Sequence, residues 1–167
     1  RPYCVESDIL FSHAGLDRNW FSMAAEAGYE TPSSLTLPEI VAWLDKTWPQ
    51  IVTLLDVCRG HPLIGVGYLR GGDQMTGGIT WQDFNEHLAI PGLKQIVGHT
   101  IFPPDKGPLF RFPGKKGTPV ARYTSKGVNP RWMTNGWTLC LDTNNKHYAV
   151  LENNILTIKS VKWSRPK

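Results

Sequence analysis

A short apolar run that ends in a histidine constrains the fold of this chain more than any other stretch. Residues 8–16 read Asp-Ile-Leu-Phe-Ser-His-Ala-Gly-Leu, so three apolar side chains precede Ser12 and His13, and the turn-forming Gly15 follows. This pattern predicts a buried strand that ends at His13. Because ligands of α/β sheets bind outside the carboxyl ends of the strands, His13 is a candidate functional residue.

A second stretch has the same design. Residues 95–100 read Gln-Ile-Val-Gly-His-Thr and place His99 beside a glycine at the end of a short apolar strand. Taken alone, either histidine fits a hydrogen-bonded structural residue better than a ligand. Two histidines at strand ends can converge on one point, and neutral imidazole is a common metal ligand. We therefore expect the rings of His13 and His99 to lie close enough to share one ion, with nitrogen–metal distances of about 2.0–2.1 Å for zinc.

Four segments carry a family resemblance that extends over most of the chain in order. They are Ser-His-Ala-Gly-Leu followed by Trp20, Gly-Gly-Ile-Thr-Trp-Gln-Asp at 77–83, Val-Gly-His-Thr at 97–100 and Cys-Leu-Asp-Thr at 140–143. Together they resemble the calcineurin-like metallophosphoesterases, in the branch of bacterial and phage enzymes related to the phosphoprotein phosphatases. The Asp-x-His, Gly-Asp-x-x-Asp-Arg-Gly and Gly-Asn-His-Glu motifs of that family are absent from this sequence.

The resemblance implies an α/β (α+β) sandwich, the C-terminal part of a four-layer metallophosphoesterase fold that is rich in β-structure at its C-terminal end. Residues 1–167 would form a single domain, part of a larger catalytic domain whose absent N-terminal half holds most metal ligands and the general acid. The chain alone is therefore expected to be an inactive fragment. It is also expected to bind the missing half or another copy of itself, because the strand at 9–11 or at 96–97 would have an uncovered edge.

As a function, the resemblance implies a hydrolase that cleaves phosphomonoesters or phosphoproteins at two divalent ions, with manganese, iron or zinc as the metal. His13 and His99 match two ligands of the same ion. Two histidines are fewer than the usual three protein ligands, so durable metal binding by this chain alone is not expected. Asp83 matches the Trp-x-Asp of the family and is expected to orient a histidine or an arginine. Arg70 has no matched position; its chemistry suits a clamp on phosphate oxygens, and a solvated loop arginine is an equal alternative.

Composition supports an alternative of another class, a non-enzymatic basic module that binds nucleic acid or a protein partner. The net charge is +4 and seven tryptophans are present, which favours anionic partners and aromatic interfaces. Basic residues alternate with two aromatic residues between positions 106 and 116, a pattern that suits single-stranded nucleic acid, although a solvated loop is the favoured interpretation. These residues are Lys106, Phe110, Arg111, Phe112, Lys115 and Lys116.

The cysteines and the hydropathy pattern limit the setting of the protein. Three widely spaced cysteines disfavour both a disulfide framework and a zinc–thiolate site, and they favour a reducing, cytoplasmic location. No apolar run approaches the roughly 18 residues that span a bilayer, so no membrane partner is expected.

Local patterns predict the remaining elements. Residues 1–7 lead into the first strand, and short β-strands follow position 119. His61, His87 and His147 lie outside the matched motifs and are expected to be structural or exposed. The other predicted segments are a helix at 17–27, a helix that begins after Thr36 and breaks at Pro49 before Cys58, a short helix at 81–88, a loop at 105–117, and strands at 120–123, 137–142, 147–152 and 155–161.

Overall fold

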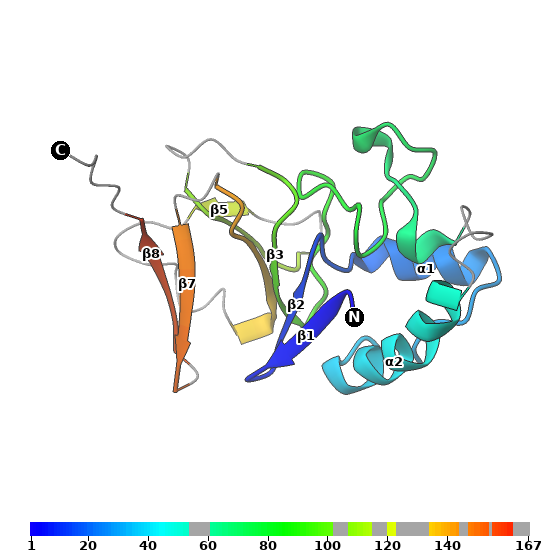
Figure 1. The fold of residues 1–167 in the computed structure, drawn as a ribbon, viewed down its shortest axis with the longest axis horizontal. Helices are drawn as coiled ribbons and strands as arrows, with labels where there is room; N and C mark the ends of the chain where they lie inside the picture. The colour runs from blue at the N-terminus through cyan, green and yellow to red at the C-terminus, as the bar shows by residue number, and fades with distance from the viewer. Residues whose placement is uncertain are drawn as a thin grey trace.

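The computed structural model describes residues 1–53, 61–101, 107–114, 120–122, 134–143, 147–153 and 155–161. Within these residues the fold mixes α-helices and β-strands, with one six-stranded and one two-stranded sheet (Figure 1). No helix in this part of the chain is both long and apolar enough to cross a membrane. The elements are β1 (Tyr3–Glu6), β2 (Ile9–Ser12), α1 (Arg18–Glu26), α2 (Leu37–Thr53), the 3-10 turns η1 (Pro62–Ile64) and η2 (Tyr68–Arg70), β3 (Lys94–Val97), β4 (Leu109–Arg111), β5 (Val120–Arg122), β6 (Trp137–Cys140), β7 (His147–Glu152) and β8 (Ile155–Ser160).

Three parallel strands form the centre of the larger sheet, whose order is β1-β2-β3-β6-β4-β5. β3 runs parallel to both β2 and β6, and β1, β4 and β5 are antiparallel to their neighbours. The register pairs Ser12 with Val97, and Val97 with Cys140. The carboxyl ends of β2, β3 and β6 therefore lie level at one edge of the sheet.

The predicted uncovered edge is wrong for both candidate strands. The segment expected to be a simple lead-in forms β1, which pairs with β2 from Tyr3 opposite Ser12 to Glu6 opposite Ile9. β2 therefore lies between β1 and β3, and β3 lies between β2 and β6. Association with another chain stays a prediction, but these two strands no longer supply a reason for it.

Helices α1 and α2 cover one face of the central strands (Figure 1). Their apolar side chains form a core with Leu10 of β2, and Trp20, at 1% exposure, is the largest fully buried side chain of this core. Asp17 and Asn19 were both candidate caps for this helix, and the structure selects Asp17: its carboxylate accepts hydrogen bonds from the backbone N–H groups of Asn19 (2.6 Å) and Trp20 (3.3 Å). Gly28 follows the helix with a φ of 82°, a left-handed conformation that glycine adopts without strain.

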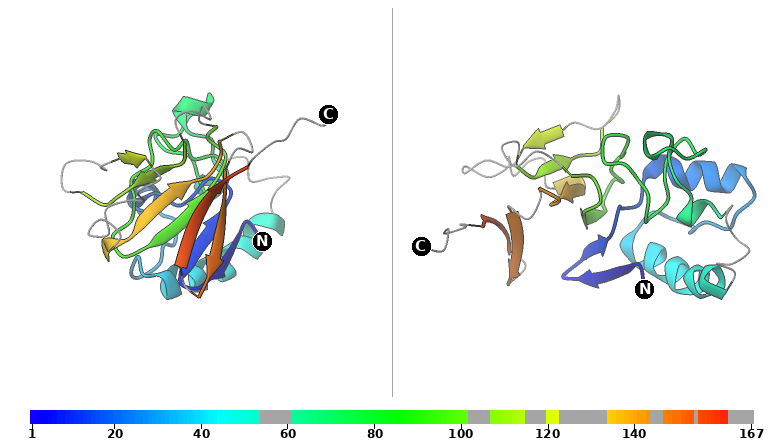
Figure 2. Two further views of the ribbon diagram at one scale, coloured as in Figure 1. Left: turned by 90° about the vertical axis from the view of Figure 1, so that its left-hand side faces the viewer. Right: turned by 45° about the horizontal axis from the view of Figure 1, so that its top comes forward.

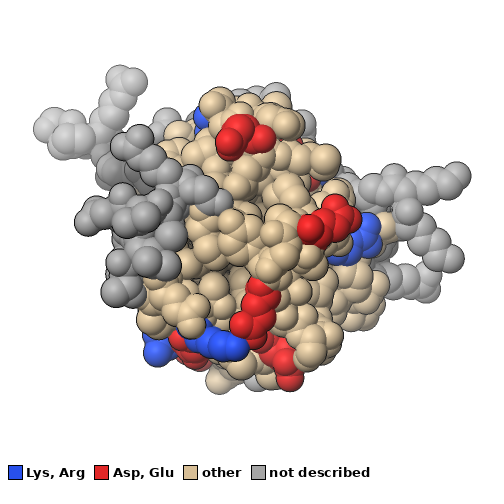
Figure 3. Space-filling model, turned by 90° about the vertical axis from the view of Figure 1, so that its right-hand side faces the viewer, with Lys and Arg blue, Asp and Glu red and all other residues tan. Residues whose placement is uncertain are grey.

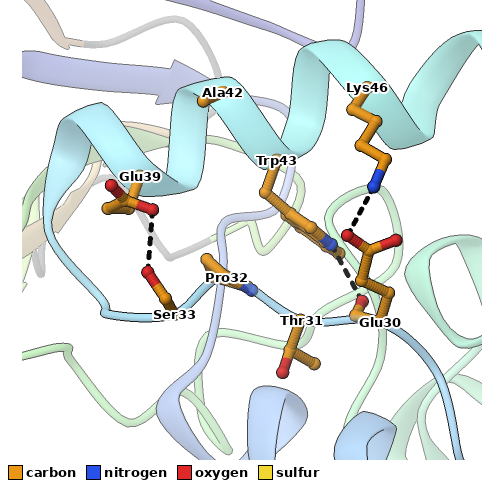
Figure 4. A pocket seen from close by; sticks show the side chains of 8 residues that line it. All are labelled: Glu30, Thr31, Pro32, Ser33, Glu39, Ala42, Trp43 and Lys46. Atoms are coloured by element: carbon orange, nitrogen blue, oxygen red, sulfur yellow. Dashed lines mark hydrogen bonds and ion pairs between the residues drawn. The ribbon is translucent and has the colours of Figure 1, made fainter.

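Helix α2 continues through Pro49, so the predicted break at this residue is wrong. Ile51 beyond the proline is buried in the core, and this packing outweighs the hydrogen bond that a proline removes from a helix. The loop before α2 is fastened to it, since Trp43 Nε1 donates to the Glu30 carbonyl at 2.8 Å and Lys46 contacts the Glu30 carboxylate at 2.6 Å (Figure 4). The predicted continuation to Cys58 lies outside the described residues.

The opposite face of the sheet packs against the β7–β8 hairpin, which lies in front of it in the left view of Figure 2. Ile158 of β8 joins a cluster that contains Ile9, Ile96, Trp137 and Leu139 of the larger sheet. The strands predicted after position 119 are thus present as β5, β6, β7 and β8.

The predicted loop at 105–117 contains a strand instead. β4 pairs with β6, and Phe110 and Phe112 are buried in the same cluster as Ile158. These two rings are therefore not available for stacking on bases, while Lys106, Lys115 and Lys116 lie outside the described part of the chain. On the face seen in Figure 3, acidic side chains are spread widely and basic ones lie toward the margin, so the described residues of this face form no broad positive patch.

The predicted helix at 81–88 is replaced by turns whose backbone N–H groups bind side chains. The N–H of Phe84 donates to Thr100 Oγ1 at 2.8 Å, and the N–H of Asn85 donates to Asp83 Oδ1 at 2.8 Å. The N–H of Leu88 donates to the Asp17 carboxylate. Because distant side chains satisfy these donors, the segment gains no advantage from helical hydrogen bonds.

His87 lies in this segment and is fully buried, in agreement with the structural role expected from the sequence. Its Nε2 lies 2.8 Å from Thr138 Oγ1, and its ring stacks on Phe84. Burial, with a smaller effect of the Arg111 charge, lowers the pKa of His87 from 6.5 to about 3. The folded protein therefore keeps a neutral imidazole at a pH where the unfolded chain already binds a proton.

This difference predicts that His87 contributes to acid denaturation. The stabilisation from the neutral, buried ring of His87 is fully present above pH 6.5 and is lost as the pH falls toward 3. Between pH 7 and pH 5 the lost free energy of unfolding is about 2 kcal/mol. Urea unfolding of the native chain and of His87→Gln should be compared at both pH values. The native chain should lose about 2 kcal/mol more than the variant, and equal losses would contradict the prediction.

Candidate functional site

The two candidate metal ligands meet at the carboxyl edge of the parallel strands. His13 directly follows β2, and His99 lies two residues after β3. His13 Nε2 is 2.7 Å from His99 Nδ1, and the ring centroids are 4.7 Å apart at an angle of 69°. At this distance one ring donates a hydrogen bond to the other. The structure thus brings together the two histidines that the sequence places at strand ends, and their role as metal ligands stays a prediction.

A tight turn presents the His99 side chain. His99 has a φ of 67°, and the N–H of Thr100 donates to the Gly98 carbonyl at 2.8 Å. A hydrogen bond across one residue of positive φ is the signature of a classic γ-turn, which is rare and strained. The N–H of Gly98 donates to the His13 carbonyl at 2.9 Å and ties the turn to the end of β2.

Arg70 and Asp83 lie behind this turn. Arg70 Nε forms an ion pair with Asp83 Oδ2 at 2.8 Å, and the Asp83 side chain is only 8% exposed. One terminal nitrogen of Arg70 donates to Thr100 Oγ1 at 3.0 Å and to the His99 carbonyl at 3.3 Å. Asp83 was expected to orient a histidine or an arginine, and in the structure it contacts an arginine, Arg70. Arg70 is not a solvated loop residue: it is the last residue of η2, and it joins this 3-10 turn to the turn that carries His99.

The surroundings of His99 favour a neutral imidazole. Burial is the main reason that its pKa lies below the ordinary value, and the positive charge of Arg70 acts in the same direction. The nearby Asp83 and Asp142 carboxylates oppose the shift. Trp81 contacts the ring edge-on with a centroid distance of 5.3 Å, and it is 44% exposed, so it forms an outer wall of the site.

Cys140 and Asp142 also belong to this edge, although sequence reasoning gave neither of them a role. The buried Cys140 thiol lies 3.6 Å from the Gly98 carbonyl and 3.4 Å from the Thr100 carbonyl, and burial raises its pKa to about 12, so it acts as a donor. Asp142 lines a cavity of about 420 Å³ that Ser12 also lines. The signal that could have identified both residues is the parallel register, which sets the end of β6 level with those of β2 and β3.

His61 and His147 are held by local hydrogen bonds, which agrees with the structural or exposed positions expected for them. His61 Nδ1 accepts from the N–H of Leu63 at 3.1 Å and caps η1. His147 Nδ1 lies 2.8 Å from Thr143 Oγ1.

The donor atoms at this edge fit part of a metal site. Two imidazoles converge, and His99 Nε2 is buried without a hydrogen-bond partner. Imidazole suits zinc and iron, and a site that combines imidazole with carboxylate also suits manganese. Within the described residues, however, no group of three or more histidine, cysteine, aspartate or glutamate side chains is arranged to hold a metal ion. Comparison of the chain with family models, curated proteins and solved structures gave no match.

Proposed function

We propose that this chain supplies one wall of a metal-dependent phosphoesterase site, in which His13 and His99 bind the same divalent ion. The observation that carries the proposal is the contact of 2.7 Å between the two imidazoles at the carboxyl ends of adjacent parallel strands. The order of the four sequence segments that resemble metallophosphoesterases adds independent support. The sandwich and the four-layer arrangement of that family belong to the same proposal.

The proposal requires ligands beyond those two histidines. The described residues contribute only a pair of imidazoles, so the remaining ligands and the general acid are assigned to a segment outside this chain. When bound, two divalent ions in such a site activate water and stabilise the attacking and leaving oxygens at phosphorus. The substrate class is a phosphomonoester or a phosphoprotein.

The residues of this chain then have separate tasks. The neutral ring of His99 offers a nitrogen lone pair, and the hydrogen bond from Gly98 to the His13 carbonyl keeps the two histidine backbones in register. Trp81 shields one side of the His99 ring from water. Arg70 Nε forms the ion pair with Asp83, and one terminal nitrogen donates to His99 and Thr100, so its second terminal nitrogen is the part of the guanidinium that could bind a phosphate group.

Manganese binding gives a direct test on the chain itself. Titration of Mn²⁺ into protein with ¹⁵N-labelled histidines should broaden the ring resonances of His13 and His99 first, because paramagnetic broadening acts at short range. His61, His87 and His147 are internal controls, and the double variant His13→Ala/His99→Ala should lose the selective effect. Equal broadening of all five histidines, or none, would contradict the proposal.

Activity of the chain alone should be absent under the same conditions. With Mn²⁺ present, hydrolysis of p-nitrophenyl phosphate is expected to stay at the background rate, because two protein ligands fall short of the three that catalytic sites normally use. Robust metal-dependent hydrolysis would show that the catalytic ligands lie within these residues.

A further inference from the structure

We propose that the Asp83–Arg70 ion pair is a positioning device that holds His99 in its left-handed γ-turn and thereby keeps its ring against His13. The inference rests on the proposed function only in treating this ring as a metal ligand. The conformational claim concerns the chain by itself. It assigns Arg70 a task different from binding phosphate.

The first step of the argument is that His99 occupies a backbone conformation that it does not prefer. Non-glycine residues are rare at a φ of 67°, and a side chain there disfavours the left-handed conformation by roughly tenfold in population. Gly98, the residue before it, could adopt such a conformation without cost, yet the positive φ falls on the histidine. Strain of this kind persists only where surrounding contacts enforce it, and it concentrates at functional sites.

The second step identifies the contacts that enforce the turn. Arg70 donates to the His99 carbonyl at 3.3 Å and to the side chain of Thr100 at 3.0 Å, so it binds the central residue and the one that follows. Asp83 fixes the guanidinium through its contact with Nε at 2.8 Å. From the opposite side, the Cys140 thiol lies within hydrogen-bond distance of the Gly98 and Thr100 carbonyls.

The third step concerns the geometry of the guanidinium. The planar guanidinium of an arginine can contact a carboxylate with one nitrogen and two oxygen acceptors with another. A lysine ammonium lacks this fixed arrangement of donors. Asp83 is almost fully buried and anchored by Asn85, whose N–H and side-chain amide lie 2.8 and 2.9 Å from Asp83 Oδ1. The contacts from Asp83 through Arg70 to His99 therefore connect a buried carboxylate to the turn at the edge of the site.

The test is an NMR measurement on the metal-free chain. A positive φ brings the amide proton of a residue close to its own Hα, so the intraresidue cross-peak of His99 should be unusually strong in the native chain. In Arg70→Leu and in Asp83→Asn, residue 99 is expected to leave the left-handed conformation. Conformations with negative φ should then be favoured over it roughly tenfold in population. Its intraresidue cross-peak should then weaken, and contacts between the His13 and His99 rings should be lost, while the amide shifts of β3 stay unchanged.

Arg111→Leu is the matched control. Arg111 is another partly buried arginine, and it also binds the segment that contains Asp83, through the Asn85 carbonyl at 2.8 Å. Within the described residues it makes no hydrogen bond to the His99 turn. This variant should keep the strong His99 cross-peak. The inference is overturned if Arg70→Leu and Asp83→Asn both fold and keep that cross-peak, or if Arg111→Leu loses it as well. This NMR test uses no metal, so it is independent of the manganese titration. If the titration fails and the NMR test succeeds, the proposed function is rejected and the positioning role of the ion pair still holds.

Discussion

Replacement of His99 by alanine is expected to lower the phosphoesterase activity of a protein that carries this chain together with the remaining ligands by at least about a hundredfold. Loss of groups that merely orient metal ligands costs about 10–100-fold in activity or metal affinity, and removal of a ligand should cost at least as much. The comparison uses kcat/KM for p-nitrophenyl phosphate at fixed Mn²⁺. A higher Mn²⁺ concentration should restore part of the activity, because the variant has lost affinity and not its fold.

His61→Ala is the control for this experiment. His61 caps a 3-10 turn and lies outside the His13–His99 pair, so its removal should leave kcat/KM nearly unchanged. Circular dichroism should show the same fold for both variants. Full activity of His99→Ala would exclude His99 as a ligand and, with it, the proposed site.

The largest effect on stability is expected for Trp20→Ala. Trp20 is 1% exposed, its Nε1 donates to the Pro62 carbonyl at 2.9 Å, and its ring contacts Phe21 and Trp43 at centroid distances of 5.0 and 5.5 Å. Truncation of a buried tryptophan leaves a cavity and costs about 3–5 kcal/mol. Urea unfolding monitored by far-UV circular dichroism measures this change in the free energy of unfolding.

Two further variants separate the causes. Trp20→Phe keeps most of the packing and removes the hydrogen bond to Pro62, so it should cost about 1–3 kcal/mol for the lost bond and the lost volume. The Pro62 carbonyl keeps its second hydrogen bond, from the N–H of Gly65. Trp81→Ala is a matched exposed site and should change stability by about 0.5 kcal/mol or less. If Trp20→Ala were as mild as Trp81→Ala, the assignment of Trp20 to the main core would be wrong.

The sequence patterns of the strands, and the residues at the strand ends, predicted most of the features that the structure confirms. Ile9-Leu10-Phe11 and Ile96-Val97 form strands as predicted, because an apolar run between turn signals has few other stable arrangements. The contact between His13 and His99 follows from those strands being parallel neighbours in level register. Asp17 was also predictable as a helix cap, since its effect is local.

Two of the errors come from long-range contacts that a local pattern does not contain. The segment at 81–88 has helical spacing, yet Thr100 and Asp17 take up its N–H groups from far along the chain. β4 lies in a segment rich in proline, glycine and lysine, and it forms a strand because β6 offers it a partner. The roles of Arg70 and Cys140 behind the His99 turn were hidden for the same reason.

The parallel pairing of β2 with β3 also determines when the histidine pair can form during folding. His13 and His99 are 86 positions apart, so the chain must close a long loop before the two rings can meet, and such non-local contacts form slowly. Helices α1 and α2 lie inside that loop and can form within about a microsecond. Assembly of the site is therefore a late kinetic step, and the ring contact between the histidines reports that β2 and β3 have paired.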